Sequence, residues 1–519
     1  MSEKEYNPKN PQVERGVLPP MPEEIFLAKE KKKINWKRIF FILLGVFLFL
    51  VVYFSPPWPH AIDPQGQHFE LTHEGKAAVG LFLLASIWWV FEVLPIGVTA
   101  IAIGALQVLF LIYRIDEDGK KLPITEAFRD FMDSSVWFIF GSLVIGLVFT
   151  KTGLTRRLAY KMLAMVGEKT SMIYLGCMLI TAALTHIMAH TAVAATIFPL
   201  LMAINSLYSE DEKPTKFGKG LFIGMAYVAG AGSIITLLGA ARGAVAIGFF
   251  RQFTGKEISF FGLTYYMFPI GWVMVFLLWG LMMVLFRPEK STIPGIRERA
   301  KSLYARLGKI SKNEIISLLI IGGAILFLSF TSFIPPLKVL NKSAIMLIAT
   351  VLFFILNILD VKDLEEIPWN IILLFGGAMS IGYCLWMTGA AKWLAVEWLA
   401  MFVQAPKFVF IMSIAIFVLL MTNFIMNVAA IAISLPVALV IAKYLGVAAE
   451  VILFASLTTA GMPFLLLIGA APNAIAYGSG QFTSGEFFRT GIIASILLMG
   501  VLAVFVQIVW PLMGMSVYL

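Results

Sequence analysis

Cysteine, histidine and charged residues are all scarce in this chain. Its 519 residues include 2 cysteines and 5 histidines, and only 14% are charged. Cys177 and Cys384 stand alone in apolar runs, so the sequence predicts no disulfide, redox pair or metal site built on cysteine. The low charge excludes an ordinary soluble domain, in which about 25% of residues are charged.

Long apolar segments make up much of the chain. Hydrophobic residues make up 59% of the chain, and runs such as 40–54, 267–286 and 492–513 are long enough to cross a bilayer. These runs lack the alternation of polar and apolar residues that is typical of barrel strands. We therefore expect an all-α polytopic membrane protein with about 11 transmembrane helices, plus two apolar stretches too short or too glycine-rich to span cleanly.

The net charge of +9 is concentrated in segments 29–38 and 287–312. Basic residues beside spans follow the positive-inside pattern, and no basic, aromatic-rich domain points to nucleic acid. We expect the N-terminus in the cytoplasm of a cell (inner) membrane and the C-terminus outside. The predicted parts are a cytoplasmic tail (1–38), a first transmembrane half (39–286, with its repeat from about 77), a basic cytoplasmic linker (287–312) and a second half (313–519).

Short motifs recur in the same order in the two halves. His190 precedes Pro199 by nine residues, and Asn427 precedes Pro436 by the same number. Small residues at such spacings also occur where membrane helices simply pack closely. Three matches in one order favour an internal duplication, which is typical of secondary transporters. The matching pairs are 137–154 with 370–390, 188–199 with 425–436, and 239–248 with 469–478.

The chain also resembles a known family, the divalent anion/sodium symporters of INDY type, which carry dicarboxylates, citrate or sulfate. The resemblance lies in Trp89, Glu92, Pro95 and Thr99, and in segments 149–159, 367–382 and 472–480. It implies an inverted repeat with eleven spans and two re-entrant hairpins, elevator-like alternating access and a homodimer. It further implies that 149–159 ends the first hairpin and that 367–382 starts the second.

The family's signature is altered at both hairpins. Its Ser-Asn-Thr triplets align with Ala189-His190-Thr191 and Met426-Asn427-Val428, and its Thr-Pro-Pro-Asn loops with residues 240–243 and 470–473. In the family, the Asn and Thr side chains hold substrate carboxylates, while Ser, Asn and loop carbonyls hold sodium. The resemblance therefore gives His190, Thr191, Arg242, Asn427 and Asn473 as substrate-binding candidates, and Asn427, Gly469 and Asn473 as cation-binding candidates.

The first half has lost most of its cation ligands. Sodium needs several hard oxygen donors, and here Ala189 lacks the family's hydroxyl and His190 replaces its amide. Arg242 adds a fixed positive charge on the neighbouring loop. We expect sodium coupling to be weakened or lost in this half, and the second half leaves the question open.

Three interpretations of Arg242 remain at this point. In the first, Arg242 is a snorkelling or paired arginine at a helix end. In the second, its charge replaces that of the missing sodium ion, and its guanidinium binds an anion through two hydrogen bonds. In the third, it is a gating residue. The arginine favours anions over cationic substrates.

His186 and His190 form H-x-x-x-H, which on one helix would share a face. No glutamate or third ligand accompanies them, so we expect no metal site. His190 is a hydrogen-bonded residue of the bundle, a substrate contact or a carrier of the coupling proton.

The sequence thus predicts a secondary transporter of small anions, with di- or tricarboxylates first. Its partners are the anion, the bilayer and a second copy of the chain, and it needs no cofactor beyond a coupling sodium or proton. The histidines supply no nucleophile–base set, so we predict no enzyme. The alternatives are a carrier of sulfate or another anion, and a non-transporting anion sensor or scaffold on a transporter fold.

Overall fold

The computed structural model describes residues 36–62, 68–110, 125–209, 213–334, 336–337, 340–399 and 405–519. Within these ranges nearly all regular structure is helical, apart from a two-stranded ribbon of β1 (Ala61–Ile62) and β2 (His68–Phe69). Nine helices of the described ranges are long and apolar enough to cross a membrane, and four shorter apolar helices accompany them. The all-α membrane architecture is confirmed, while the number of eleven spans stays a prediction.

The first half runs from α1 to α11. Polar caps begin several of its helices: Thr72 caps α2, Thr215 caps α9 and Ser259 caps α11. The helices are α1 (Trp36–Phe54), α2 (His73–Val90), α3 (Ile96–Leu109), α4 (Glu126–Arg129), η2 (Asp130–Met132), α5 (Ser134–Thr152), α6 (Leu154–Val166), α7 (Thr170–Thr185), α8 (His190–Tyr208), α9 (Lys216–Ser233), α10 (Arg242–Thr254) and α11 (Phe260–Leu285).

The second half follows the basic linker, which itself contains the helix α12 (Ile296–Arg306). Ser311 and Glu314 form a capping box at the start of the next helix. The helices are α13 (Lys312–Phe333), α14 (Lys342–Ile355), α15 (Val361–Glu365), α16 (Trp369–Met387), α17 (Ala390–Leu399), α18 (Lys407–Phe424), α19 (Asn427–Tyr444), α20 (Ala449–Ala460), η4 (Leu467–Gly469), α21 (Ala471–Tyr477), α22 (Ser484–Val504), η5 (Phe505–Val509) and α23 (Trp510–Leu512).

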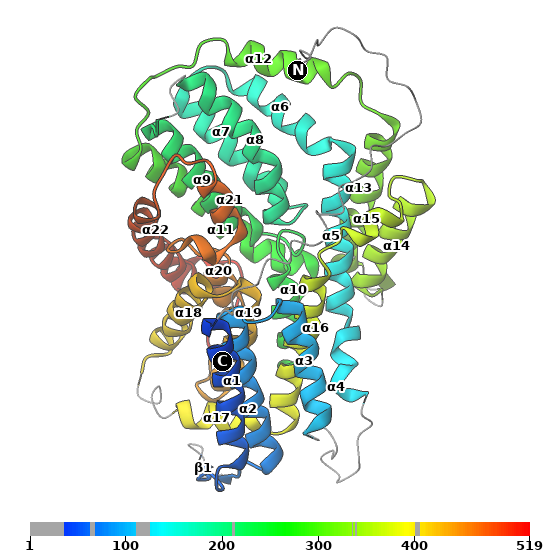
Figure 1. The fold of residues 1–519 in the computed structure, drawn as a ribbon, viewed down its shortest axis with the longest axis vertical. Helices are drawn as coiled ribbons and strands as arrows, with labels where there is room; N and C mark the ends of the chain where they lie inside the picture. Colours follow the sequence, from blue (N-terminus) through cyan, green and yellow to red (C-terminus); the bar gives the residue numbers. More distant parts are fainter. Residues whose placement is uncertain are drawn as a thin grey trace, which may run out of the picture.

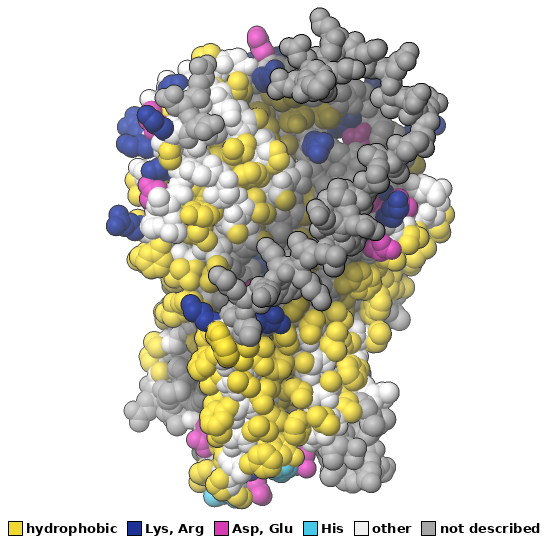
Figure 2. All heavy atoms as spheres, in the orientation of Figure 1, with side chains coloured by type: hydrophobic (Ala, Val, Ile, Leu, Met, Phe, Trp, Pro, Cys, Tyr) yellow, Lys and Arg dark blue, Asp and Glu magenta, His cyan; other side chains and the backbone are white. Residues whose placement is uncertain are grey.

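The surface of α1 shows how the chain meets lipid. Trp36, Phe40, Leu43, Phe47 and Phe54 are each at least 60% exposed. Their spacing puts them along one outward stripe of the helix. Figure 2 shows an apolar surface over α1 and its neighbours, with basic side chains above it and acidic ones at its lower edge. An exposed apolar face of this extent fits a bilayer as its solvent.

Two helical hairpins approach the middle of the molecule (Figure 1). The first is α7–α8 and the second is α18–α19, and each is followed by a helix that is broken in the middle. The first broken helix is α9–α10, and the second is α20–α21. The helix α10 lies centrally and packs against α5, α16, α19 and α20. The order hairpin, then broken helix, is therefore the same in both halves.

The placement of the hairpins differs from the prediction. Segment 149–159 spans the end of α5 and the start of α6, joined by Gly153 in a left-handed turn (φ 83°), and segment 367–382 lies mostly in the continuous helix α16. The helices α5 and α16, in which these segments partly lie, hold most of the matching stretches 137–154 and 370–390 of the repeat. Glycine-rich helices and hairpins share a composition, so the motifs alone did not distinguish a span from a reversal.

Candidate functional site

The site lies where each hairpin turns beside the broken helix of its own half. We call residues 186–190 the first tip and 234–241 the first break, and residues 423–427 the second tip and 461–470 the second break. His190 and Asn427 are the first residues of α8 and α19, while Pro199 and Pro436 lie inside the same helices. The matched spacing in the sequence therefore corresponds to matched positions at the two tips.

Hydrogen bonds join the first tip to the first break. The backbone N–H of His190 donates to the carbonyl of Gly239 at 3.1 Å, and the Thr236 hydroxyl donates to the carbonyl of His186 at 2.6 Å. A Cβ atom on Gly239 would lie 2.3 Å from the Thr185 carbonyl oxygen and 2.7 Å from that of Ser233. Only glycine permits this close approach of three backbone segments.

Amide side chains join the second tip to the second break. Asn423 Oδ1 accepts from the backbone N–H groups of Leu465 at 2.8 Å and Leu466 at 3.2 Å. Asn473 Nδ2 donates to the carbonyls of Pro463 at 2.8 Å and Leu466 at 3.1 Å. The unwound backbone is thus satisfied by side chains, as irregular backbone within a membrane requires.

The Thr422 hydroxyl connects the second tip to the end of α20. Its oxygen lies 3.0 Å from both Asn427 Oδ1 and the carbonyl of Ala460. The carbonyl of Thr422 lies 3.1 Å from the Cβ position of Gly469, which packs tightly in the second break. Asn427, Gly469 and Asn473, the cation-binding candidates, therefore belong to one packed cluster.

Arg242 is buried at the junction of the two halves. Arg242 is the first residue of α10 and is 2% exposed. Its Nη2 donates to the Ser233 hydroxyl at 2.7 Å. A Cβ on Gly461, at the start of the second break, would lie 2.8 Å from the same nitrogen. No acidic side chain of the described ranges forms an ion pair with it. The arginine is thus neither snorkelling to the surface nor paired with a carboxylate.

Unpaired polar atoms gather around the first tip. Both ring nitrogens of His186, Nδ1 of His190, Nη1 of Arg242 and Nε1 of Trp272 are buried and have no hydrogen-bond partner among the described residues. The rings of His186 and Trp272 lie 5.5 Å apart. Buried polar atoms without partners are unfavourable and are normally satisfied by water or a ligand. The first tip therefore has capacity for a polar ligand.

The two tips differ in chemistry at equivalent positions. Aligning His190 with Asn427 also aligns His186 with Asn423 and Thr185 with Thr422. In the second half, Asn423 accepts two backbone N–H groups, but the imidazole of His186 makes no such bond within the described chain. Thr422, Asn423 and Ser233 were missed in the sequence analysis, although the same alignment would have indicated the first two.

Comparison with known proteins identifies the chain. The family model described as the transmembrane region of sodium:sulfate symporters matches residues 30–516. The chain belongs to the sodium:sulfate symporter family. Two similar relatives are named sodium-dependent dicarboxylate transporter SdcS. The one from Staphylococcus saprophyticus is 24% identical over 518 residues, covering 94% of this chain and 95% of the relative. The one from Staphylococcus aureus is 24% identical over 508 residues, covering 93% and 94%.

Solved structures share the fold of this symporter-family chain at low sequence identity. The YdaH transporter of Alcanivorax borkumensis superposes with a TM-score of 0.53 at 14% identity, covering 92% of this chain and 98% of that one. MtrF of Neisseria gonorrhoeae, described as an antimetabolite efflux pump, gives a TM-score of 0.51 at 12% identity, covering 90% and 93%. At these identities the likeness shows the transporter fold alone.

The histidine pair of this family member is not arranged as its spacing predicted. His186 ends α7 and His190 begins α8, so the helix is interrupted between them and they do not share a helical face. In the part of the chain that the structure describes, no group of three potential metal ligands occurs. Thr191 is exposed, and within the described ranges no hydrogen bond joins its side chain to the other candidates. Its role as a substrate contact stays a prediction.

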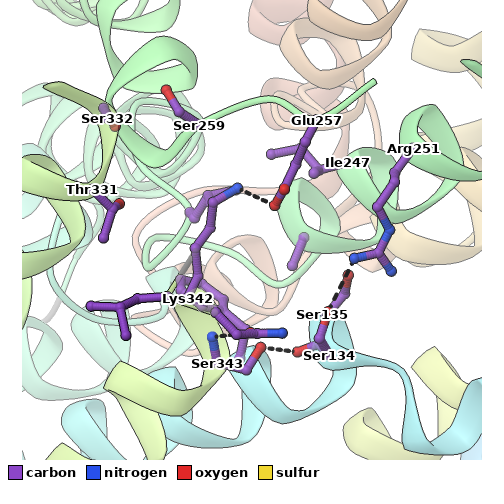
Figure 3. Close-up of a pocket in the computed structure, with 15 residues that line it drawn as sticks. Ser134, Ser135, Ile247, Arg251, Glu257, Ser259, Thr331, Ser332, Lys342 and Ser343 are labelled. Carbon is purple, nitrogen blue, oxygen red and sulfur yellow. Dashed lines mark hydrogen bonds and ion pairs between the residues drawn. The ribbon is translucent and has the colours of Figure 1, made fainter. Parts of the chain in front are cut away.

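A polar cavity of about 490 Å³ lies beside α10 (Figure 3). Its lining includes Leu237 of the first break and the charged residues Arg251, Glu257 and Lys342, which take part in two ion pairs. Lys342 of α14 pairs with Glu257 at 2.8 Å, and Arg251 of α10 pairs with Asp133, the N-cap of α5, at 2.5 Å. The end of α10 and the residues after it are thereby tied to α5 and α14.

Proposed function

We propose that this member of the sodium:sulfate symporter family carries small anions, with dicarboxylates first, by alternating access. The observation that carries the proposal is Arg242, a buried guanidinium with a nitrogen that has no partner among the described residues, at the junction of the two halves. An arginine fork binds carboxylates in two-point contact. The names of the two SdcS relatives support a dicarboxylate as the substrate. His190, Thr191, Asn427 and Asn473 complete the proposed substrate site.

We propose further that sodium coupling is weakened or lost. A sodium ion about 5 Å from the guanidinium would be repelled by roughly 3 kcal/mol at an effective dielectric of about 20. This is about a hundredfold in affinity. In the second half, the carbonyls of Pro463 and Leu466 already accept from Asn473. His190, whose Nδ1 is unpaired, is the proposed carrier of a coupling proton if one is used.

The proposed setting is a homodimer in the cell membrane, with the N-terminus in the cytoplasm and the C-terminus outside. The basic linker 287–312 supports this orientation through the positive-inside rule. The family resemblance supports the dimer. Reaction of cysteines introduced into the linker with an impermeant maleimide, in spheroplasts and in inverted vesicles, tests the orientation.

Uptake by proteoliposomes tests the function and the coupling together. Purified protein is offered labelled succinate, citrate, sulfate or phosphate, with sodium or with choline as the external cation, against protein-free liposomes. We expect succinate uptake that choline changes by less than a factor of two, because the first-half cation ligands are missing. Uptake that collapses in choline contradicts the coupling proposal. Binding of anions without any flux contradicts transport and favours a sensor.

The Lys342–Glu257 pair in the cavity (Figure 3) and the Arg251–Asp133 pair should together restrain α10 against α5 and α14. Partly exposed pairs contribute about 0.2–1 kcal/mol each, so the Asp133→Asn/Glu257→Gln variant should open the cavity about twofold to thirtyfold more often. The reporter is Ile247→Cys, at a lining position that is 7% exposed in the native protein. Its rate of reaction with an impermeant maleimide measures opening.

The two native cysteines are buried and should give little background in this assay. Glu450→Gln is the matched control. The Lys256–Glu450 pair joins the residues just after α10 to α20, and neither residue lines the cavity. Equal rates of maleimide reaction with and without the Lys342–Glu257 and Arg251–Asp133 pairs would show that these pairs do not restrain α10.

A further inference from the structure

A second cavity of about 690 Å³ lies between α6, α8 and α12. Its wall is mainly apolar: α8 contributes residues between Ala195 and Leu207, α6 contributes Leu163, and α12 contributes Leu303. From Ala195 to Leu207 a helix rises roughly 18 Å, at about 1.5 Å per residue. This length is close to one leaflet, about half of the ~30 Å hydrocarbon core. We call this cavity the α8 groove.

Two arginines line the α8 groove beside this apolar wall. Arg156 of α6 and Arg299 of α12 are both exposed. Neither side chain forms an ion pair or a hydrogen bond with another residue in the ranges that the structure covers. The adjacent Arg157, in contrast, is buried against Glu314 at 2.6 Å and supports the fold. Two arginines that have no ion-pair partner among the described residues therefore stand next to an apolar groove.

We propose that the α8 groove binds an anionic phospholipid, with its phosphate between Arg156 and Arg299 and an acyl chain along α8. The charge complements an anionic headgroup, and the apolar wall complements a chain of leaflet length. Basic pockets between membrane helices are suited to such headgroups. A small hydrophilic anion would satisfy the arginines but would leave the apolar wall without a partner.

The position of this lipid links it to the hairpin. The helix α8 begins at His190 of the first tip, and its stretch from Ala195 to Leu207 forms the groove with α6 and α12. A lipid in the α8 groove would contact the hairpin arm on one side and the helices α6 and α12 on the other. The lipid site is independent of which anion the protein carries, so its test does not depend on transport.

Native mass spectrometry of the full-length protein tests the proposal with two lipids of the same chains, palmitoyl-oleoyl phosphatidylglycerol and phosphatidylcholine. We expect one phosphatidylglycerol to bind more tightly than phosphatidylcholine. Each basic residue near an anionic headgroup contributes a factor of about five. Arg156→Gln/Arg299→Gln should therefore weaken that binding about thirtyfold. Ala203→Trp, which fills the wall at an exposed position that lines the groove, should weaken binding of both lipids at least tenfold.

The matched control is Arg297→Gln/Lys301→Gln, which removes two exposed charges of α12 that do not line the groove. It should retain the preference for phosphatidylglycerol. Three results would overturn the proposal: an equal loss in the control, full binding by Ala203→Trp with an unchanged melting temperature, or displacement of the lipid by millimolar succinate or glycerol phosphate. The last result would make the α8 groove a passage for soluble anions.

Discussion

Replacing Arg242 with methionine is expected to lower anion uptake at least about thirtyfold while making the protein more stable. The guanidinium is 2% exposed, has one unpaired nitrogen and is bonded to a neutral hydroxyl of Ser233. Removing a charge that meets a carboxylate in a dry site costs about 2–5 kcal/mol of binding. Replacing buried ion pairs with apolar side chains of similar volume often stabilises a fold by about 1–4 kcal/mol, and Arg242 has no ion-pair partner among the described residues to offset its burial.

Uptake of labelled succinate and the melting temperature of the same preparations measure the two effects. Arg489→Met, at an exposed position of α22, is the control and should change neither. Arg242→Lys keeps the charge without the fork, so partial activity is expected. A loss of stability in Arg242→Met that parallels the loss of uptake would mean that the arginine supports the fold and does not bind the anion.

Gly239→Ala is expected to abolish uptake and to reduce the yield of folded protein. The new methyl group would lie 2.3 Å from the Thr185 carbonyl oxygen, 2.7 Å from the Ser233 oxygen and 2.9 Å from the Ser233 Cα, all of them backbone atoms. The first tip and the first break must separate to relieve these contacts, which breaks the bond from His190 N–H to the Gly239 carbonyl. Overpacking of this kind costs about 1–3 kcal/mol or more.

Gly243→Ala is a matched control four residues along the chain. Its methyl group would meet only the flexible end of the Leu237 side chain at 3.1 Å, with that residue's Cα at 4.0 Å. Alanine also favours the helix that Gly243 occupies, by about 1 kcal/mol. Size-exclusion profiles, melting temperatures and uptake should therefore separate the two variants. Equal behaviour would show that the contact at Gly239 is not limiting.

The sequence predicted the helical membrane fold because hydropathy and the repeat are long-range signals that many residues carry. It did not predict where the chain reverses. The first tip, from His186 to His190, contains neither glycine nor proline, so no local residue marks it. The reversal depends on tertiary bonds, such as Thr236 to the carbonyl of His186.

The sequence likewise predicted some features of the site and not others. The spacing to Pro199 and Pro436 placed His190 and Asn427 at equivalent helix starts, and the structure agrees. The sequence could not say whether Arg242 had an acidic partner, because any such residue would lie far away in the chain. Burial and the single bond to Ser233 became visible only when the two halves were packed together.

Arg242 also has an electrical consequence. If Arg242 moves across the membrane together with the bound anion, its positive charge adds to the charge of the anion. The charge at the site is then positive when it is empty and negative when it holds a doubly charged anion. The membrane potential acts on one elementary charge with about 2.3 kcal/mol per 100 mV. Voltage would therefore drive the empty and the loaded site in opposite directions.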